Sequence, residues 1–171
     1  MRSFRPIAII SVVAFIASLF IIVPVSSRPP KESKIIRDFC AHRAAYEQLR
    51  TMLSDDKGVG IVADFGIENT DSPISKIPPD GGMAVERYQK YLALLKEIGA
   101  SRVARGPEPL EVGFGVWASG FAGDTRHVEV CWLERQPSNI VLSLDAFYRT
   151  AKPRSPSYVH IDGHWYIWAD W

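Results

Sequence analysis

Apolar and polar residues alternate along two stretches in the middle of the chain, residues 111–118 and 127–133. Side chains of a β-strand point alternately to the two sides of a sheet, so each stretch places its β-branched and aromatic residues on one face. These residues are Val112, Phe114, Val116 and Ala118 in the first stretch, and Val128, Val130 and Trp132 in the second. Residues 119–124 between them are rich in Gly and other turn formers, so the pattern predicts an antiparallel hairpin.

The opposite face of this hairpin is predicted to be mixed in character. It receives Glu111, Gly113, Gly115 and Trp117 from the first strand, and His127, Glu129, Cys131 and Leu133 from the second. Glycines allow another backbone or a ligand to approach a strand closely. His127 and Glu129 are spaced to share this face, and they are candidates for a small polar, catalytic site. The alternative is a half-exposed surface pair without a function.

Two helices are expected from apolar residues that recur at steps of three and four. The first helix runs from Glu32 to Ser54, with His42 on its apolar stripe, and ends near Gly58. The second runs from Gly82 to Ile98, after a candidate N-cap at Asp80. Residues 59–67 between them predict one strand, followed by a long loop over residues 68–82.

The C-terminal part of the chain predicts further strands. Residues 101–105 and 140–144 are expected as edge strands, and residues 145–148 as a helical turn. Asp162-Gly163 lies between two β-rich runs and favours a two-residue hairpin turn. In the expected register Tyr158 faces Ile167, and His160 and His164 fall on opposite faces of the sheet. They cannot then share one ion, so no metal site is expected.

The C-terminus is also strongly aromatic. Trp168 and Trp171, together with Trp117 of the central hairpin, are candidates for a surface that binds a ligand or a partner. The alternative is that the C-terminal aromatic residues fill the core beneath the two helices.

An apolar segment precedes this domain. Residues 6–27 carry no charge, and their length lies between that of a signal peptide and that of a spanning helix, nearer the latter. We expect a signal-anchor or signal peptide over residues 1–27, a spacer over residues 28–34, and a single extracytoplasmic domain over residues 35–171. The membrane is thus an expected partner through residues 6–27. The domain is expected in the periplasm or at the cell surface, and it is secreted if Val25-Ser26-Ser27 is a cleavage site.

Charge and motifs exclude several classes of function. Without Arg2 and Arg5, the 20 basic and 19 acidic residues leave a net charge of about −1, which gives no reason to propose a nucleic-acid partner. The chain has no GxSxG elbow, phosphate-binding Gly-rich loop, HExxH or CxxC, so no cofactor is expected.

The chain contains two cysteines, Cys40 and Cys131. In an oxidising compartment they could form one disulfide, which would contribute about 4 kcal/mol in the chain-entropy model. Two buried free thiols are the alternative.

The ending Asp162-Gly163-His164-Trp165 is similar to the closing strands of cone-shaped α+β domains such as those of the NTF2-like superfamily. The similarity covers about the last dozen residues and transfers no residue roles. We expect an α+β domain in which two amphipathic helices pack on one face of a mostly antiparallel sheet of five or six strands. The first functional hypothesis is a membrane-anchored, non-catalytic module that binds a ligand or a protein of the cell envelope. The second, implied by the resemblance, is a small NTF2-like enzyme with its site around His127 and Glu129.

Overall fold

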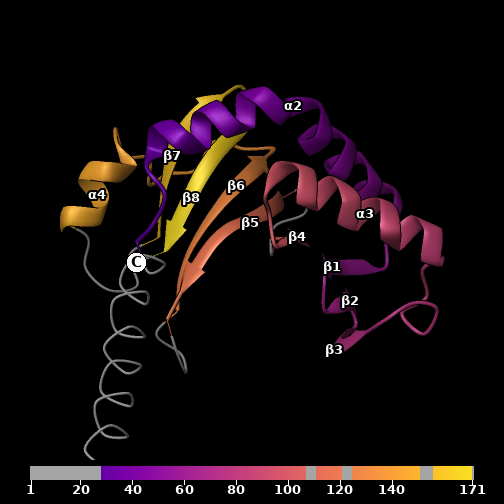
Figure 1. The fold of residues 1–171 in the computed structure, drawn as a ribbon. Coiled ribbons are helices and arrows are strands. Elements are labelled where there is room, and N and C mark those ends of the chain that lie inside the picture. The colour runs from indigo at the N-terminus through magenta and orange to yellow at the C-terminus, as the bar shows by residue number, and fades with distance from the viewer. Residues whose placement is uncertain (1–27, 107–110, 121–124, 151–155, 171) are drawn as a thin grey trace, which may run out of the picture.

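The computed structural model describes residues 28–106, 111–120, 125–150 and 156–170. This part of the chain folds into an α+β domain with three helices and one antiparallel sheet of eight strands (Figure 1). The helices are α2 (Glu32–Asp55), α3 (Val85–Ile98) and α4 (Leu144–Thr150). The strands are β1 (Val59–Ala63), β2 (Gly66–Asn69), β3 (Ser72–Lys76), β4 (Arg102–Arg105), β5 (Glu111–Ser119), β6 (Arg126–Leu133), β7 (Ser157–Asp162) and β8 (Trp165–Asp170).

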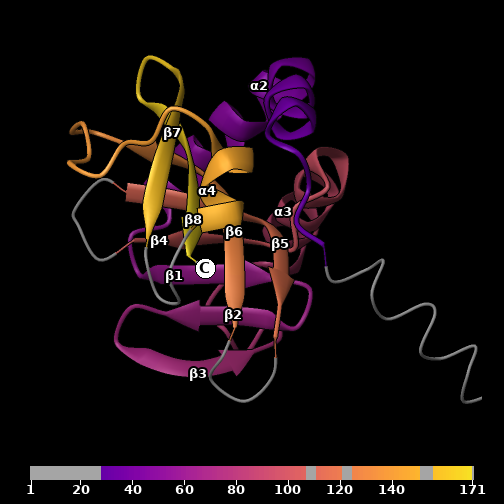
Figure 2. The same ribbon diagram turned by 90° about the vertical axis from the view of Figure 1, so that its left-hand side faces the viewer.

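The order of strands in the sheet is β3-β2-β1-β4-β5-β6-β8-β7. α3 connects β3 to β4, so the chain leaves the sheet at one edge and returns beside β1. The sheet turns strongly along its length, and β1 to β3 run across the direction of β5, β6 and β8 (Figure 2). The expected α+β class is confirmed, but the sheet has eight strands rather than five or six.

The main core lies between one face of the sheet and the two long helices. One row of paired residues crosses five strands on this face, and every member is buried: Val103, Phe114, Val130, Ile167 and Val159. Trp165 is 2% exposed, and its ring centroid lies 5.0 Å from that of Phe39 on α2. Its indole N–H donates to Glu47 Oε1 at 3.0 Å. The core-filling alternative is therefore confirmed for Trp165.

The two predicted long helices are present, with small differences. The apolar stripe of α2 is buried as expected except at His42, whose φ of −119° interrupts the helical backbone. His42 Nδ1 instead lies 3.6 Å from Glu97 Oε1 on α3. α3 begins at Val85 rather than Gly82, with Ala84 rather than Asp80 at the N-cap position. It ends at Gly99, where φ is +66°, a conformation that favours glycine.

The extra strands come from residues 59–76. The prediction of one strand over residues 59–67 is wrong, because the chain turns at Asp64 and Phe65 and returns as β2. Gly66 has a φ of +133°, which few other residues could adopt. The predicted loop over residues 68–82 contains β3, which pairs with β2. The predicted edge strand over residues 101–105 is β4, and it lies inside the sheet, between β1 and β5.

The C-terminal hairpin is present, but its register differs by one residue from the expected one. The two turn residues are Gly163 and His164, and a bulge near Ile161 places Tyr158 opposite Trp168. Of the edge strand expected over residues 140–144, only one bridge forms, between Ile140 and Tyr158.

α4 follows this bridge and is joined to the start of α2. Glu32 Oε2 accepts a hydrogen bond from the Leu144 backbone N–H at 2.6 Å. In return, Asp145 Oδ1 accepts one from the Glu32 N–H at 3.2 Å. Each acidic side chain thus satisfies a backbone donor at the start of the other helix. The predicted membrane segment lies outside the described residues, among which no helix is long and apolar enough to cross a membrane.

Candidate functional site

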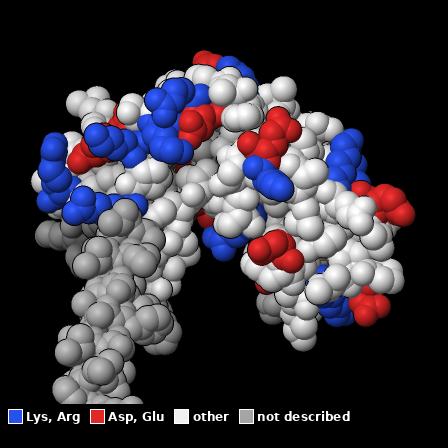
Figure 3. Space-filling model, viewed as in Figure 1, with Lys and Arg blue, Asp and Glu red and all other residues white. Residues whose placement is uncertain are grey.

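The face of the sheet away from α2 and α3, called the open face below, carries a second row of paired residues. From β4 to β7 this row contains Arg102, Gly115, Glu129, Trp168 and Tyr158. No helix of the described part of the chain covers it, because the main core places all three helices on the other face. The space-filling view shows the molecule arching over a hollow on the side away from α2 and α3 (Figure 3).

An ion pair crosses this face above two glycines. Arg102 Nη2 donates to Glu129 Oε1 at 2.7 Å, although β5 separates their two strands. Gly113 leaves room for the carboxylate: a methyl group at this position would overlap Glu129 Oε2. A methyl group at Gly115 would lie 3.1 Å from Arg102 Cγ. The glycines therefore permit a close approach, as expected, but the groups that approach β5 are the side chains of Glu129 and Arg102.

An aromatic wall continues the open face over β7 and β8. Cys131, Leu133 and Tyr166 form a small second apolar cluster, and Tyr158 and Trp168 pack against it. Burial, with the nearby charges of Glu111 and Glu129, raises the pKa of Tyr158 to about 12. The Tyr158 hydroxyl therefore stays protonated at neutral pH and can donate a hydrogen bond.

Between the ion pair and the aromatic wall lies a pocket of about 310 Å³. It is lined by Arg102, Ala104, Arg105, Gly106, Glu111, Gly113, Glu129, Tyr158 and Trp168. Among the described residues of this lining, two side chains are basic and two are acidic, so their formal charges balance. Such a pocket, with a few polar groups beside aromatic side chains, has the composition of a small-ligand site.

The two predicted catalytic residues do not act as a pair in the structure. Glu129 bonds to Arg102, and its side chain is only 13% exposed. His127 is half-buried, lies opposite Ala118 and Asp170, and does not line the pocket. Among the described residues, no hydrogen bond or ion pair joins His127 to Glu129. Their spacing in the sequence placed them on one face of a strand but did not bring them into contact.

The three candidate tryptophans lie in different environments. Trp168 lines the pocket. The expected position of Trp117 beside Gly113 is wrong, because a bulge at Val116 turns Trp117 to the helix side, where it packs against the main core. Trp171 lies outside the described residues.

The cysteines are free, and the disulfide considered from the sequence is not formed. Cys40 is exposed on α2, whereas Cys131 is buried in the second cluster on the open face. The sheet lies between them, so a bond would need a large movement of the backbone. Burial raises the pKa of the Cys131 thiol well above its ordinary value, which makes it unreactive.

The histidines of the last hairpin contact different neighbours. The ring of His160 lies 5.1 Å from that of Tyr166, and the ring of His164 lies 5.4 Å from that of Trp132. The described ranges contain no group of three or more His, Cys, Asp or Glu residues that could hold a metal ion.

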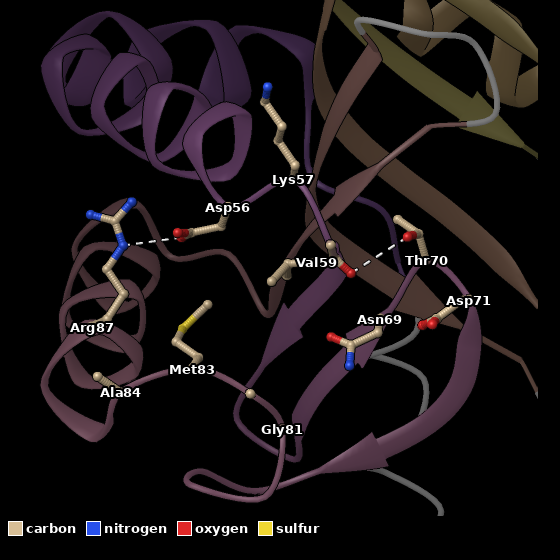
Figure 4. Close-up of a pocket in the computed structure, with 12 residues that line it drawn as sticks. Asp56, Lys57, Val59, Asn69, Thr70, Asp71, Gly81, Met83, Ala84 and Arg87 are labelled. Carbon is tan, nitrogen blue, oxygen red and sulfur yellow. Dashed lines mark hydrogen bonds and ion pairs between the residues drawn. The ribbon is translucent and has the colours of Figure 1, made fainter.

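A larger pocket, of about 630 Å³, lies where the end of α2 meets the start of α3 (Figure 4). Asp56 accepts hydrogen bonds from Arg87 Nε at 3.0 Å and from the Tyr91 hydroxyl at 2.8 Å. Arg87 Nη2 also donates to the Met52 carbonyl, the C-terminal end of α2, at 3.2 Å. These bonds give this region a structural role, as a joint between the two helices.

Sequence reasoning missed five residues of the open-face pocket: the polar Arg102 and Tyr158, and also Ala104, Arg105 and Gly106. Arg102 lies in a short strand with little periodicity, 27 residues before Glu129. Tyr158 was placed opposite the wrong residue. The signal available in the sequence was the pair of glycines in β5, which indicated that another group approaches this strand closely.

The chain matches no protein-family model, no curated protein and no solved structure. The resemblance of its last hairpin to NTF2-like domains therefore stays a prediction.

Proposed function

We propose that this protein is a membrane-anchored, non-catalytic binding module of the cell envelope, and that its ligand or partner docks on the open face of the sheet. The observation that carries the proposal is the pocket over Gly113 and Gly115, which combines an ion pair and an aromatic wall on a face that no helix of the described residues covers. The uncharged, apolar residues 6–27 support the membrane location, because their length is close to that of a spanning helix.

Binding is favoured over catalysis by the state of the charged groups. An acid–base catalyst needs a titratable group free to exchange a proton with its substrate. Glu129 is instead held by Arg102, and His127 lies outside the pocket lining. The alternative, an NTF2-like enzyme, has the support of one observation, the presence of Glu129 in a pocket.

Photo-crosslinking in cells tests the binding surface. A photoreactive phenylalanine analogue replaces Ala104, which lines the pocket, in the full-length tagged protein. The matched control carries the same analogue at Ala93, an exposed position of α3. We expect a crosslinked species of higher mass from position 104 and none from position 93. Identical products from both positions, or none from position 104, would show that the open face is not the binding surface.

A further inference from the structure

The open-face pocket contains more hydrogen-bond donors than its own residues use. Arg102 bonds to Glu129 through Nη2, and its remaining guanidinium N–H groups form no hydrogen bond with described residues. The same holds, within the described ranges, for the Tyr158 hydroxyl and the Trp168 indole N–H. A ligand rich in hydrogen-bond acceptors would therefore suit this pocket.

The charge balance of the pocket argues against an ionic ligand. An anion would have to compete with Glu129 for Arg102 and would approach a second carboxylate, that of Glu111. The other basic side chain is already committed, because Arg105 donates to the carbonyls of Leu53 at 2.5 Å and Val59 at 3.3 Å. A cation would meet a Glu129 carboxylate that Arg102 already neutralises. A neutral polar molecule avoids the cost of burying an unpaired charge.

The shape of the pocket favours a ring. Its floor at Gly113 has no side chain, and Trp168 and Tyr158 stand opposite each other across β8 and β7 to form one wall. An indole offers a flat apolar surface with a polar N–H, which suits a ring with apolar faces and a polar rim. The volume, about 310 Å³, is at the small end of the range for ligand sites, so it holds one or two rings.

From the donors, the balanced charge and the flat wall, we infer that the open-face pocket binds a neutral sugar ring of an envelope glycan. The ring stacks on Trp168, and its hydroxyl groups accept hydrogen bonds from Arg102 and Tyr158. This inference rests on the proposed function, in which the open face is the binding surface.

The test uses the full-length protein in lipid nanodiscs, because detergents with sugar headgroups would compete. N,N′-Diacetylchitobiose, maltose and cellobiose are the neutral probes, with glucuronic acid and glucosamine as charged analogues. Binding is measured by saturation-transfer NMR and by tryptophan fluorescence. We expect at least one neutral disaccharide to bind, and the charged analogues to bind about tenfold more weakly or worse.

Three variants connect binding to the pocket. Trp168→Leu keeps an apolar side chain against the second cluster but removes the ring, and it should weaken sugar binding about tenfold or more. Arg102→Lys keeps the charge but loses the planar array of donors, and should also weaken binding. Phe65→Leu makes a matched change at a 55% exposed aromatic residue in the β1–β2 turn and should bind as the wild type does. Thermal unfolding of each variant checks that the fold is retained.

Three results would overturn the inference: no binding of any neutral disaccharide, tighter binding of glucuronic acid, or unchanged binding by Trp168→Leu. If neutral sugars fail but position 104 still crosslinks a partner, the sugar assignment is wrong and the binding surface stands. If position 104 also gives no crosslink, the proposed function fails with it.

Discussion

The interaction of Gly113 with Glu129 gives the sharpest prediction for the open face. In Gly113→Ala the new methyl group would overlap Glu129 Oε2, and apart from the two chain neighbours of Gly113 the described atoms within 4 Å of it all belong to Glu129. The carboxylate must therefore move, and its hydrogen bond to Arg102 is broken or weakened.

The size of the effect follows from two opposing terms. Losing a hydrogen bond between charged groups costs about 1.5–3 kcal/mol. Because the Arg102 side chain is 34% exposed and can be rehydrated, we expect the lower part of this range. Alanine in a strand interior is favoured over glycine by about 0.5–1 kcal/mol. We therefore expect Gly113→Ala to reduce the free energy of unfolding by about 1 kcal/mol.

The same substitution should have the opposite sign in a Glu129→Ala background. With the carboxylate gone there is no overlap, so only the backbone term remains, and Gly113→Ala should stabilise by about 0.5–1 kcal/mol. The assay is a double-mutant cycle measured by urea unfolding of the four proteins, followed by circular dichroism. An equal loss of stability in both backgrounds would refute the proposed contact between Gly113 and Glu129.

Three further predictions concern other residues. Asp56→Ala removes the acceptor at the joint between the helices and should lower the free energy of unfolding by about 2 kcal/mol. The control, Asp55→Ala at the adjacent exposed position, should change it by less than about 0.5 kcal/mol. Equal effects of the two substitutions in urea unfolding would contradict the role of the joint. Tyr158 prefers its neutral form in the fold, so its contribution to stability is complete below about pH 10, the pKa of unfolded tyrosine, and is lost as the pH rises towards about 12. Tyr158→Phe should therefore lose stability less steeply than the wild type between these pH values, and parallel curves would count against this assignment. A membrane-impermeant maleimide should label the exposed Cys40 from outside intact cells, while the buried Cys131 stays unlabelled. Cys40→Ala is the control and should give no labelling. Labelling of Cys40 only after lysis would place the domain inside the cell.

The helices and the alternation of the long strands could be predicted from the sequence. The stripe of α2 and the Gly99 end of α3 depend on residues three or four apart or on a single glycine, so they are visible locally. The inward and outward residues of β5 were correct as far as Gly115, because alternation is a property of the strand itself.

The short strands and their registers could not be predicted in the same way. β2 and β3, of four and five residues, are too short to show a period, and a polar turn and an edge strand have similar compositions. The bulge near Val116 shifts the register by one residue, which was enough to place Trp117 on the wrong face. In the last hairpin the turn lies one residue later than expected and is combined with a bulge near Ile161, so Tyr158 was placed opposite the wrong partner. Bulges arise from packing across strands, which a local pattern does not contain.

Part of the candidate site could likewise be predicted from the sequence, and part could not. The faces that Glu129 and the two glycines occupy on their own strands could be read from the sequence, because alternation depends on residues one and two positions apart. The short loop between the two strands then indicated that these faces lie side by side. The three-dimensional structure was needed to show that Glu129 pairs with Arg102 rather than with His127, and that Trp168 and Tyr158 complete the pocket. These contacts join residues from four strands, and their geometry is fixed by the order and register of the sheet, which no single segment of the chain specifies.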